Sequence, residues 1–166
     1  AAPREASFLR WGRVPFWADD PSIGNRMINA RAETVPDKPA YRAAFKKRRC
    51  VIPASGFYEW KKTEDGKQPH YIRRADEQLL GFAGLWERWT DDQSGEVVES
   101  YTILTGEPND LVADVHDRMP VILEPDDYDF WLDPAMKDKE ALHDLVLQTY
   151  PADPIETYPV STHVNK

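Results

Sequence analysis

The chain has 166 residues, of which 41% are hydrophobic and 30% charged, a balance typical of globular proteins and unlike that of disordered ones. This length predicts a single domain over residues 1–166, and no apolar run approaches the roughly 20 residues of a membrane span. The one cysteine, Cys50, excludes a disulfide within the chain and favours the reducing cytoplasm as its location.

The net charge of -8 is unevenly distributed along the chain. Residues 1–74 carry 16 Lys and Arg against 8 Asp and Glu, whereas residues 75–166 carry 5 against 21. A basic half can create a local positive field where phosphates bind, even in an acidic protein. The alternative is that its densest part, the basic run at residues 46–49, is only a solvated helix end.

The first predicted element is a short aromatic strand at residues 8–11. A helix follows at residues 39–45, with Pro39 at its first position and basic residues at its end, as the helix dipole prefers. Apolar or aromatic runs then predict strands at residues 50–52, 56–60 and 69–72. Asp65-Gly66 lies between the last two runs, which predicts that they form a hairpin.

A second hairpin is predicted from the runs at residues 79–89 and 97–104, which flank a polar turn at residues 91–95. A short strand at residues 119–123 precedes helices at residues 125–132 and 139–148. In the second helix Leu142, Leu145 and Val146 recur at helical spacing. Strands in hairpin order predict an α+β domain with a mainly antiparallel sheet, partly closed into a barrel-like shape and flanked by short helices.

Three polar clusters interrupt apolar surroundings, at residues 29–33, 56–60 and 116–120. Strand alternation places Phe57, Glu59 and Lys61 on one face and Tyr58 and Trp60 on the other. If the Phe57 face lines a partly buried pocket, the pKa of Glu59 is raised and the carboxyl group can exchange protons near neutral pH. The alternative is a structural salt bridge from Glu59 to Lys61 or to an arginine.

His116 is a second proton-transfer candidate, because histidine alone titrates near pH 7 without perturbation. It can equally be a structural residue held by Asp114 or Asp117. Arg31 and Arg118 have the forked geometry that suits phosphate oxygens, or they pair with Glu33 and Asp117, respectively.

Tryptophans near arginines suggest stacking on unpaired bases, although core packing is the alternative for each of them. The candidates are Trp11, Trp17 and Trp60. The four histidines are scattered and no metal-binding spacing occurs, so we predict neither a metal nor another cofactor.

Taken in order, these segments resemble the SOS response-associated peptidase (SRAP) family. The resemblance begins at Ala2-Pro3 and covers nearly the whole chain, through WGRVPFW (11–17), PSIGNRMINARAET (21–34), RRCVIP (48–53), GFYEW (56–60), HDRMP (116–120) and PVS (159–161). It implies a compact, mainly β fold with a positively charged groove for single-stranded DNA. It also implies a covalent reaction with abasic sites, in which the amine and thiol of an N-terminal cysteine condense with the deoxyribose aldehyde to form a thiazolidine.

The resemblance also implies roles for individual residues. Glu59 corresponds to the acid/base group, His116 to the residue that assists ring opening and reversal, and Asn29 to the residue that orients the N-terminal residue. The implied DNA contacts are Arg31, Thr105 and Arg118 to the backbone and Trp60 to a base beside the lesion, with Trp17 as a further stacking residue.

This sequence departs from the family pattern at its start, which lacks Met-Cys-Gly-Arg, so we expect the catalytic N-terminal segment to be missing from residues 1–166. Cys50 falls where the family has a buried core cysteine and is not the predicted nucleophile. The predicted function is therefore a monomeric repair protein that crosslinks to abasic sites and processes its own initiator methionine. The alternatives are a general peptidase and a non-catalytic single-strand DNA-binding module.

Overall fold

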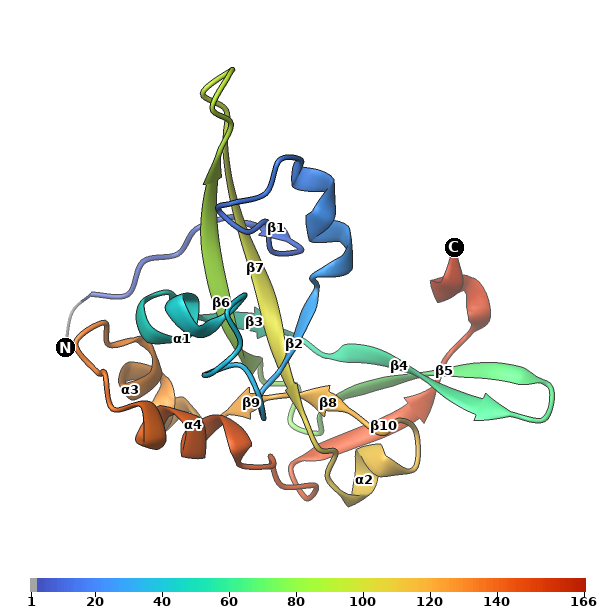
Figure 1. The fold of residues 1–166 in the computed structure, drawn as a ribbon. Helices are drawn as coiled ribbons and strands as arrows, with labels where there is room; N and C mark the ends of the chain where they lie inside the picture. The colour runs from blue at the N-terminus through green and yellow to red at the C-terminus, as the bar shows by residue number, and fades with distance from the viewer. Residues whose placement is uncertain (1–2) are drawn as a thin grey trace.

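The structure, a computed structural model, describes residues 3–166 and contains two β-sheets with short helices around them (Figure 1). The larger sheet has seven strands and is organised around the long β6–β7 hairpin. Its strands are β1 (Arg10–Trp11), β2 (Asn29–Arg31), β3 (Arg49–Ala54), β6 (Leu80–Thr90), β7 (Val97–Gly106), β8 (Met119–Pro120) and β9 (Ile122–Leu123). β3 pairs antiparallel with β6, whereas β1 and β2 pair parallel with β7.

The smaller sheet has three antiparallel strands in the order β10–β5–β4. These strands are β4 (Phe57–Thr63), β5 (Gly66–Arg74) and β10 (Ile155–Pro159). The β4–β5 hairpin extends away from the rest of the molecule (Figure 1). Both predicted hairpins and the α+β class are confirmed.

The helices are short and lie around the large sheet. They are α1 (Arg42–Lys47), α2 (Asp110–Ala113), α3 (Tyr128–Leu132) and α4 (Lys139–Leu147), with 3-10 turns η1 (Pro21–Arg26), η2 (Pro125–Asp127) and η3 (Thr162–Asn165). Within residues 3–166, no helix combines the length and apolar character needed to span a bilayer.

The expected partial closure into a barrel is wrong, because in the described part of the chain no pairing joins the two ends of either sheet. β6 and β7 diverge at one end, where β8 pairs with β7 and β9 pairs with β6. Val121 lies between these short strands, and its N–H donates to Leu104 O while its carbonyl accepts from Ala83 N. Residues 119–123 therefore lie between β6 and β7 at this end of the sheet and keep the two strands apart. They form two short strands instead of the single one predicted.

Two further expectations are wrong in detail. The helix predicted from Pro39 begins only at Arg42, because Lys38 O first accepts N–H bonds from Tyr41 and Arg42 in a turn that includes Pro39. In the strand predicted at residues 8–11, only Arg10 and Trp11 pair with β7.

The base of the β6–β7 hairpin, away from its turn, is buried on both faces. On one face Ala83, Leu85 and Leu104 pack in a cluster with side chains of α1, α3 and α4. On the other face Phe82 and Ile103 pack against residues of the smaller sheet, Phe57, Ile72 and Ile155. Burial on both sides explains why the sequence of β6 is apolar almost throughout rather than alternating.

The basic run at residues 46–49 is only partly a solvated helix end. Lys46 and Lys47 are exposed, but Arg48 donates to Glu87 at 3.1 Å and Arg49 is 7% exposed. The Arg49 guanidinium donates to five backbone carbonyl oxygens, those of Phe45, Lys46, Trp131, Asp133 and Met136. It thereby joins the end of α1 to α3 and the turn after it.

We predict that Arg49→Met lowers the free energy of unfolding by about 3 kcal/mol, because it leaves several buried carbonyl oxygens without donors. Urea denaturation followed by circular dichroism measures the change. Arg42→Met, which removes an exposed arginine of α1, is the matched control and should change stability by no more than about 0.5 kcal/mol. Equal effects of the two substitutions would contradict the role assigned to Arg49.

Candidate functional site

Glu59 and His116 come from different parts of the chain and lie next to each other. Glu59 is on β4, and His116 follows α2. His116 Nδ1 is 3.7 Å from Glu59 Oε2, and the two side chains are 39% and 23% exposed, respectively. A proton can pass between the two groups over this distance through a small approach or one bridging water.

Glu59 is poorly solvated. Burial raises the pKa of the Glu59 carboxyl group, and the negative charge of Asp117 acts in the same direction, whereas His116 and the backbone N–H of Trp60 oppose it. Among residues 3–166, His116 is the only ion-pair partner of Glu59, so the alternative of a salt bridge to Lys61 or an arginine is wrong. The raised pKa suits a carboxyl group that takes up and releases a proton near neutral pH.

His116 has hydrogen-bond partners in both of its protonation states. When Nδ1 carries no proton it accepts from the Arg118 backbone N–H at 3.2 Å. When Nδ1 is protonated it faces Arg118 O at 3.1 Å and the carboxylates of Asp117 and Glu59 at 3.5 and 3.7 Å. The loop therefore supports gain and loss of a proton at the nitrogen that points toward Glu59.

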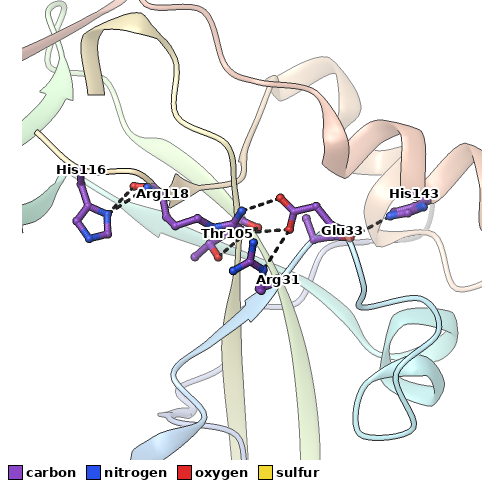
Figure 2. Close-up of polar contacts among 7 residues, drawn as sticks. Arg31, Glu33, Thr105, His116, Arg118 and His143 are labelled. Atoms are coloured by element: carbon purple, nitrogen blue, oxygen red, sulfur yellow. Dashed lines mark hydrogen bonds and ion pairs between the residues drawn. The ribbon is translucent and has the colours of Figure 1, made fainter. Parts of the chain in front are cut away.

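A second polar group, drawn in Figure 2, is built on Arg118, which follows His116 by two residues. The Arg118 guanidinium donates to both carboxylate oxygens of Glu33, at 2.7 and 2.9 Å. The same side chain donates to Thr105 O at 2.7 Å and to Thr105 Oγ1 at 3.2 Å. The alternative that Arg118 pairs with Asp117 is wrong, because the fork of the guanidinium is turned toward Glu33 instead.

Arg31 reaches the same carboxylate more loosely. Its Nε is 3.9 Å from Glu33 Oε2, and its side chain is 63% exposed. Arg118 holds the pKa of Glu33 below its usual range, so one carboxylate faces two guanidinium groups. The group therefore keeps a net positive charge, and Arg31 is its more accessible cation.

Strand pairing places Asn29 and Arg31 on the face of the large sheet that carries this site. β2 pairs in parallel with β7, so that Asn29 lies beside Ile103 and Arg31 beside Thr105. Ile103 belongs to the same core cluster as Phe57, which is two residues before Glu59 on the same face of β4. Asn29 is exposed at the rim of that cluster, and the structure records no hydrogen bond from its side chain to another described residue.

Two of the three candidate stacking tryptophans, Trp60 and Trp17, lie elsewhere. Trp60 is on the opposite face of β4 from Glu59, and its indole N–H donates to Asn165 Oδ1 at 2.6 Å. Trp17 is 56% exposed next to Ala18, whose carbonyl accepts from the indole of Trp89 near the tip of the β6–β7 hairpin. Trp89 pairs with Val98, seven residues from Thr105 along β7, which corresponds to roughly 23 Å.

Cys50 cannot serve as a nucleophile near neutral pH. It lies on β3, and burial raises the pKa of its thiol to about 12. A thiol with this pKa carries almost no thiolate at pH 7. Within residues 3–166, no group of three or more His, Cys, Asp or Glu side chains could hold a metal ion.

The arrangement can be compared with known proteins. The family model described as SOS response associated peptidase (SRAP) matches residues 1–166. The chain belongs to the SRAP family. The Abasic site processing protein YoqW from Bacillus subtilis is 47% identical over 158 residues, which cover 95% of this chain and 70% of YoqW.

More distant SRAP relatives align over nearly the same range. The Abasic site processing protein HMCES from Xenopus tropicalis is 34% identical and aligns with 99% of this chain and 55% of its own. A solved structure of a protein from Bacteroides thetaiotaomicron is 31% identical, with a TM-score of 0.87 over 95% of this SRAP chain and 71% of the Bacteroides one. This likeness confirms the SRAP-like fold.

Glu33 is the site residue whose position the sequence did not reveal. The sequence suggests Arg31 as its partner, but its principal partner, Arg118, is 85 residues away along the chain. The sequence does contain one signal, because the alternation of Asn29, Arg31 and Glu33 favours one face for all three. The contact of Glu33 with the cluster at residues 116–120, however, follows only from the tertiary structure.

We predict opposite effects on the pKa of Glu59 from substitutions on its two sides. Asp117→Asn lowers it because a neighbouring negative charge is removed, and His116→Gln raises it because the neighbouring positive charge is removed. A pH titration of the Glu59 side-chain carboxyl carbon by NMR measures both shifts. Asp114→Asn, in the same loop, is the control and should leave the titration unchanged. Shifts of the same sign in the two variants would contradict the arrangement.

Proposed function

We propose that this protein processes abasic sites in single-stranded DNA, as a monomer in the cytoplasm. The observation that carries the proposal is the half-buried Glu59–His116 pair, which lies two residues along the chain from the Arg118–Glu33 ion pair, in a chain whose relatives are named abasic site processing proteins. A proton-transfer pair next to phosphate-binding arginines suits a reaction on the sugar of a DNA strand.

Arg31 and Arg118 have different roles in binding the DNA backbone. Arg118 is fixed by Glu33 and Thr105, so that its positive charge is held in one place for a phosphate. Arg31 is loosely held and exposed, and it can turn toward a phosphate without breaking a strong contact. Thr105 contributes by orienting Arg118, and Asn29, two residues before Arg31 on β2, positions the reacting group.

The proposed chemistry needs an amine and a thiol that react together with the aldehyde form of the abasic deoxyribose. The resemblance to the family assigns both to an N-terminal cysteine exposed by self-processing of the initiator methionine. The amine adds to the aldehyde carbon, the resulting carbinolamine loses water to give an imine, and the thiol adds across the C=N bond to close the thiazolidine. Glu59 donates the proton that leaves with the hydroxyl group as water, and His116 exchanges protons during ring opening of the sugar and reversal.

The test uses the gene product bearing an N-terminal cysteine. With a single-stranded oligonucleotide that contains one abasic site, we expect a covalent product that survives denaturing electrophoresis and has the mass of both components less one water. Glu59→Gln should slow its formation by a factor of about 10² or more, the range typical of general acid–base catalysis. Glu64→Gln, which alters an exposed carboxylate beyond Glu59 in the same hairpin, is the matched control. Absence of the product with the unsubstituted protein would refute the proposal and leave only a binding module.

Arg31 gives a separate prediction about DNA binding. Arg31→Ala should reduce the slope of log K against log salt by about 0.7, the value for one phosphate contact on a single strand, without loss of stability. Arg118→Ala should weaken binding and also destabilise the fold, because it leaves the half-buried carboxylate of Glu33 without its partner. Salt-dependent fluorescence anisotropy and thermal unfolding measure the two effects. An unchanged salt slope in Arg31→Ala would contradict a phosphate contact.

A further inference from the structure

Three tyrosines form a row across the smaller sheet, one on each of its strands. Tyr71 on β5 pairs in register with Tyr58 on β4 and with Tyr158 on β10. The ring centroids of Tyr58 and Tyr71 are 5.1 Å apart, and those of Tyr71 and Tyr158 are 5.9 Å apart. The rings therefore form one continuous aromatic surface.

This row lies on the outer face of the sheet. The alternate residues of the same strands, Phe57, Ile72 and Ile155, pack into the core against the large sheet. Tyr58 and Tyr158 remain 45% and 38% exposed. A solvent-facing side of an antiparallel sheet normally carries polar residues, so a row of exposed aromatic rings there indicates a contact surface.

The central ring is held in place by the backbone beneath it. Tyr71 covers Gly56, where a Cβ atom would lie 2.4 Å from the tyrosine ring, and its hydroxyl group is 3.3 Å from Ser55 Oγ. Any larger residue at position 56 would push this ring away. The glycine of the GFYEW segment thus allows the ring to lie against the sheet.

Basic residues continue this surface toward the tip of the hairpin. Trp60 and Lys62 share the outer face of β4 with Tyr58, and Lys62 pairs in register with Lys67. Like charges directly opposite each other destabilise a sheet, and within the described chain neither lysine has an ion-pair partner. At the other end of the row, the Arg73 guanidinium lies 5.6 Å from the ring centroid of Tyr158 and is paired with Glu77 and Glu156, so the unpaired cations lie only at the hairpin end.

We propose that this outer face is a stacking platform for the unpaired nucleic-acid strand that flanks the abasic site. The bases stack on Tyr58, Tyr71 and Tyr158, and the phosphates bind Lys62 and Lys67. Exposed rings beside unpaired cations are the chemistry that unpaired bases and their backbone require. This inference rests on the proposed function for the identity of the strand.

The position of β4 supports the connection between the platform and the reaction site. β4 is an edge strand of the smaller sheet, in the order β10–β5–β4 (Figure 1). Glu59 projects from one of its faces, and Tyr58 and Trp60 project from the other. A nucleic-acid strand whose abasic site lies at Glu59 can therefore pass around the edge of β4 and continue onto the tyrosine row.

The experiment measures how affinity depends on oligonucleotide length. Single strands carry a tetrahydrofuran abasic analogue, which cannot form an imine, and have either about 5 nucleotides or about 15, extended on the 5′ or the 3′ side. We expect the unsubstituted protein to bind the long strand more tightly than the short one when the extension is on one of the two sides, and not when it is on the other. In the double variant Tyr58→Ala/Tyr158→Ala, this gain in affinity should be smaller by a factor of about ten or more. The affinity for the short strand should not change.

Conservative variants separate stacking from folding. Tyr58→Phe/Tyr158→Phe keeps the rings and should keep the length-dependent gain. Lys62→Gln/Lys67→Gln should lower the slope of log K against log salt by about 1.4 for the long strand only, at about 0.7 for each phosphate contact. Lys137→Gln/Lys139→Gln removes the same charge at the start of α4 and should leave the slope unchanged.

Two results would overturn the platform. One is an equal length-dependent gain in the unsubstituted protein and in both the Tyr→Ala and the Lys→Gln variants. The other is a concentration-dependent dimer in analytical ultracentrifugation that disappears in Tyr58→Ala/Tyr158→Ala, which would assign the face to a second copy of the chain. If the tyrosine-dependent gain is present but no product forms with true abasic DNA, the proposed function fails and the platform remains.

Discussion

The burial of the base of the β6–β7 hairpin on both faces is the constraint on which the site depends. Because Phe82 and Ile103 face the smaller sheet, Phe57 packs over them and brings β4 to a fixed distance from the large sheet. Glu59 is two residues farther along β4, at the edge of this contact, where it is neither fully buried nor fully solvated. The position of Glu59 at the edge of the hydrophobic core thus limits the solvation of its carboxyl group and raises its pKa.

The charge of the group around Glu33 is opposite in sign to the net charge of the whole protein. The chain carries a net charge of -8, yet Glu33 is shared by Arg31 and Arg118, so that these three side chains together carry one positive charge. Placement of the same carboxylate against Arg118 also orders the loop that holds His116, through the backbone N–H of Arg118. The proposed phosphate contact of Arg118 and the proposed proton transfer at His116 therefore involve one short segment, residues 116–118.

The two faces of β4 carry side chains with different surroundings. The inner face carries Phe57, which packs in the core, and Glu59, the proposed acid/base group. The outer face carries Tyr58, which is exposed, and Trp60, which is partly buried and donates to Asn165. Such a division is possible because side chains alternate along a strand and because β4 is at the edge of its sheet. A single five-residue segment, GFYEW, thereby contributes to the core, to the candidate reaction site and to an exposed aromatic surface.

The sequence by itself determined the elements whose signals are local: the two hairpins, the helical spacing of Leu142, Leu145 and Val146, the alternation of faces along β4, and the family. It also predicted that Glu59 and His116 carry chemistry. Only the tertiary structure decided that these two residues are neighbours, that Arg118 pairs with Glu33 and not with Asp117, and that the sheet stays open. Hydrophobic periodicity records which side of an element is buried but not which distant element covers it, so contacts between β4, β2 and the loop at residues 116–118 emerge only when the core is packed.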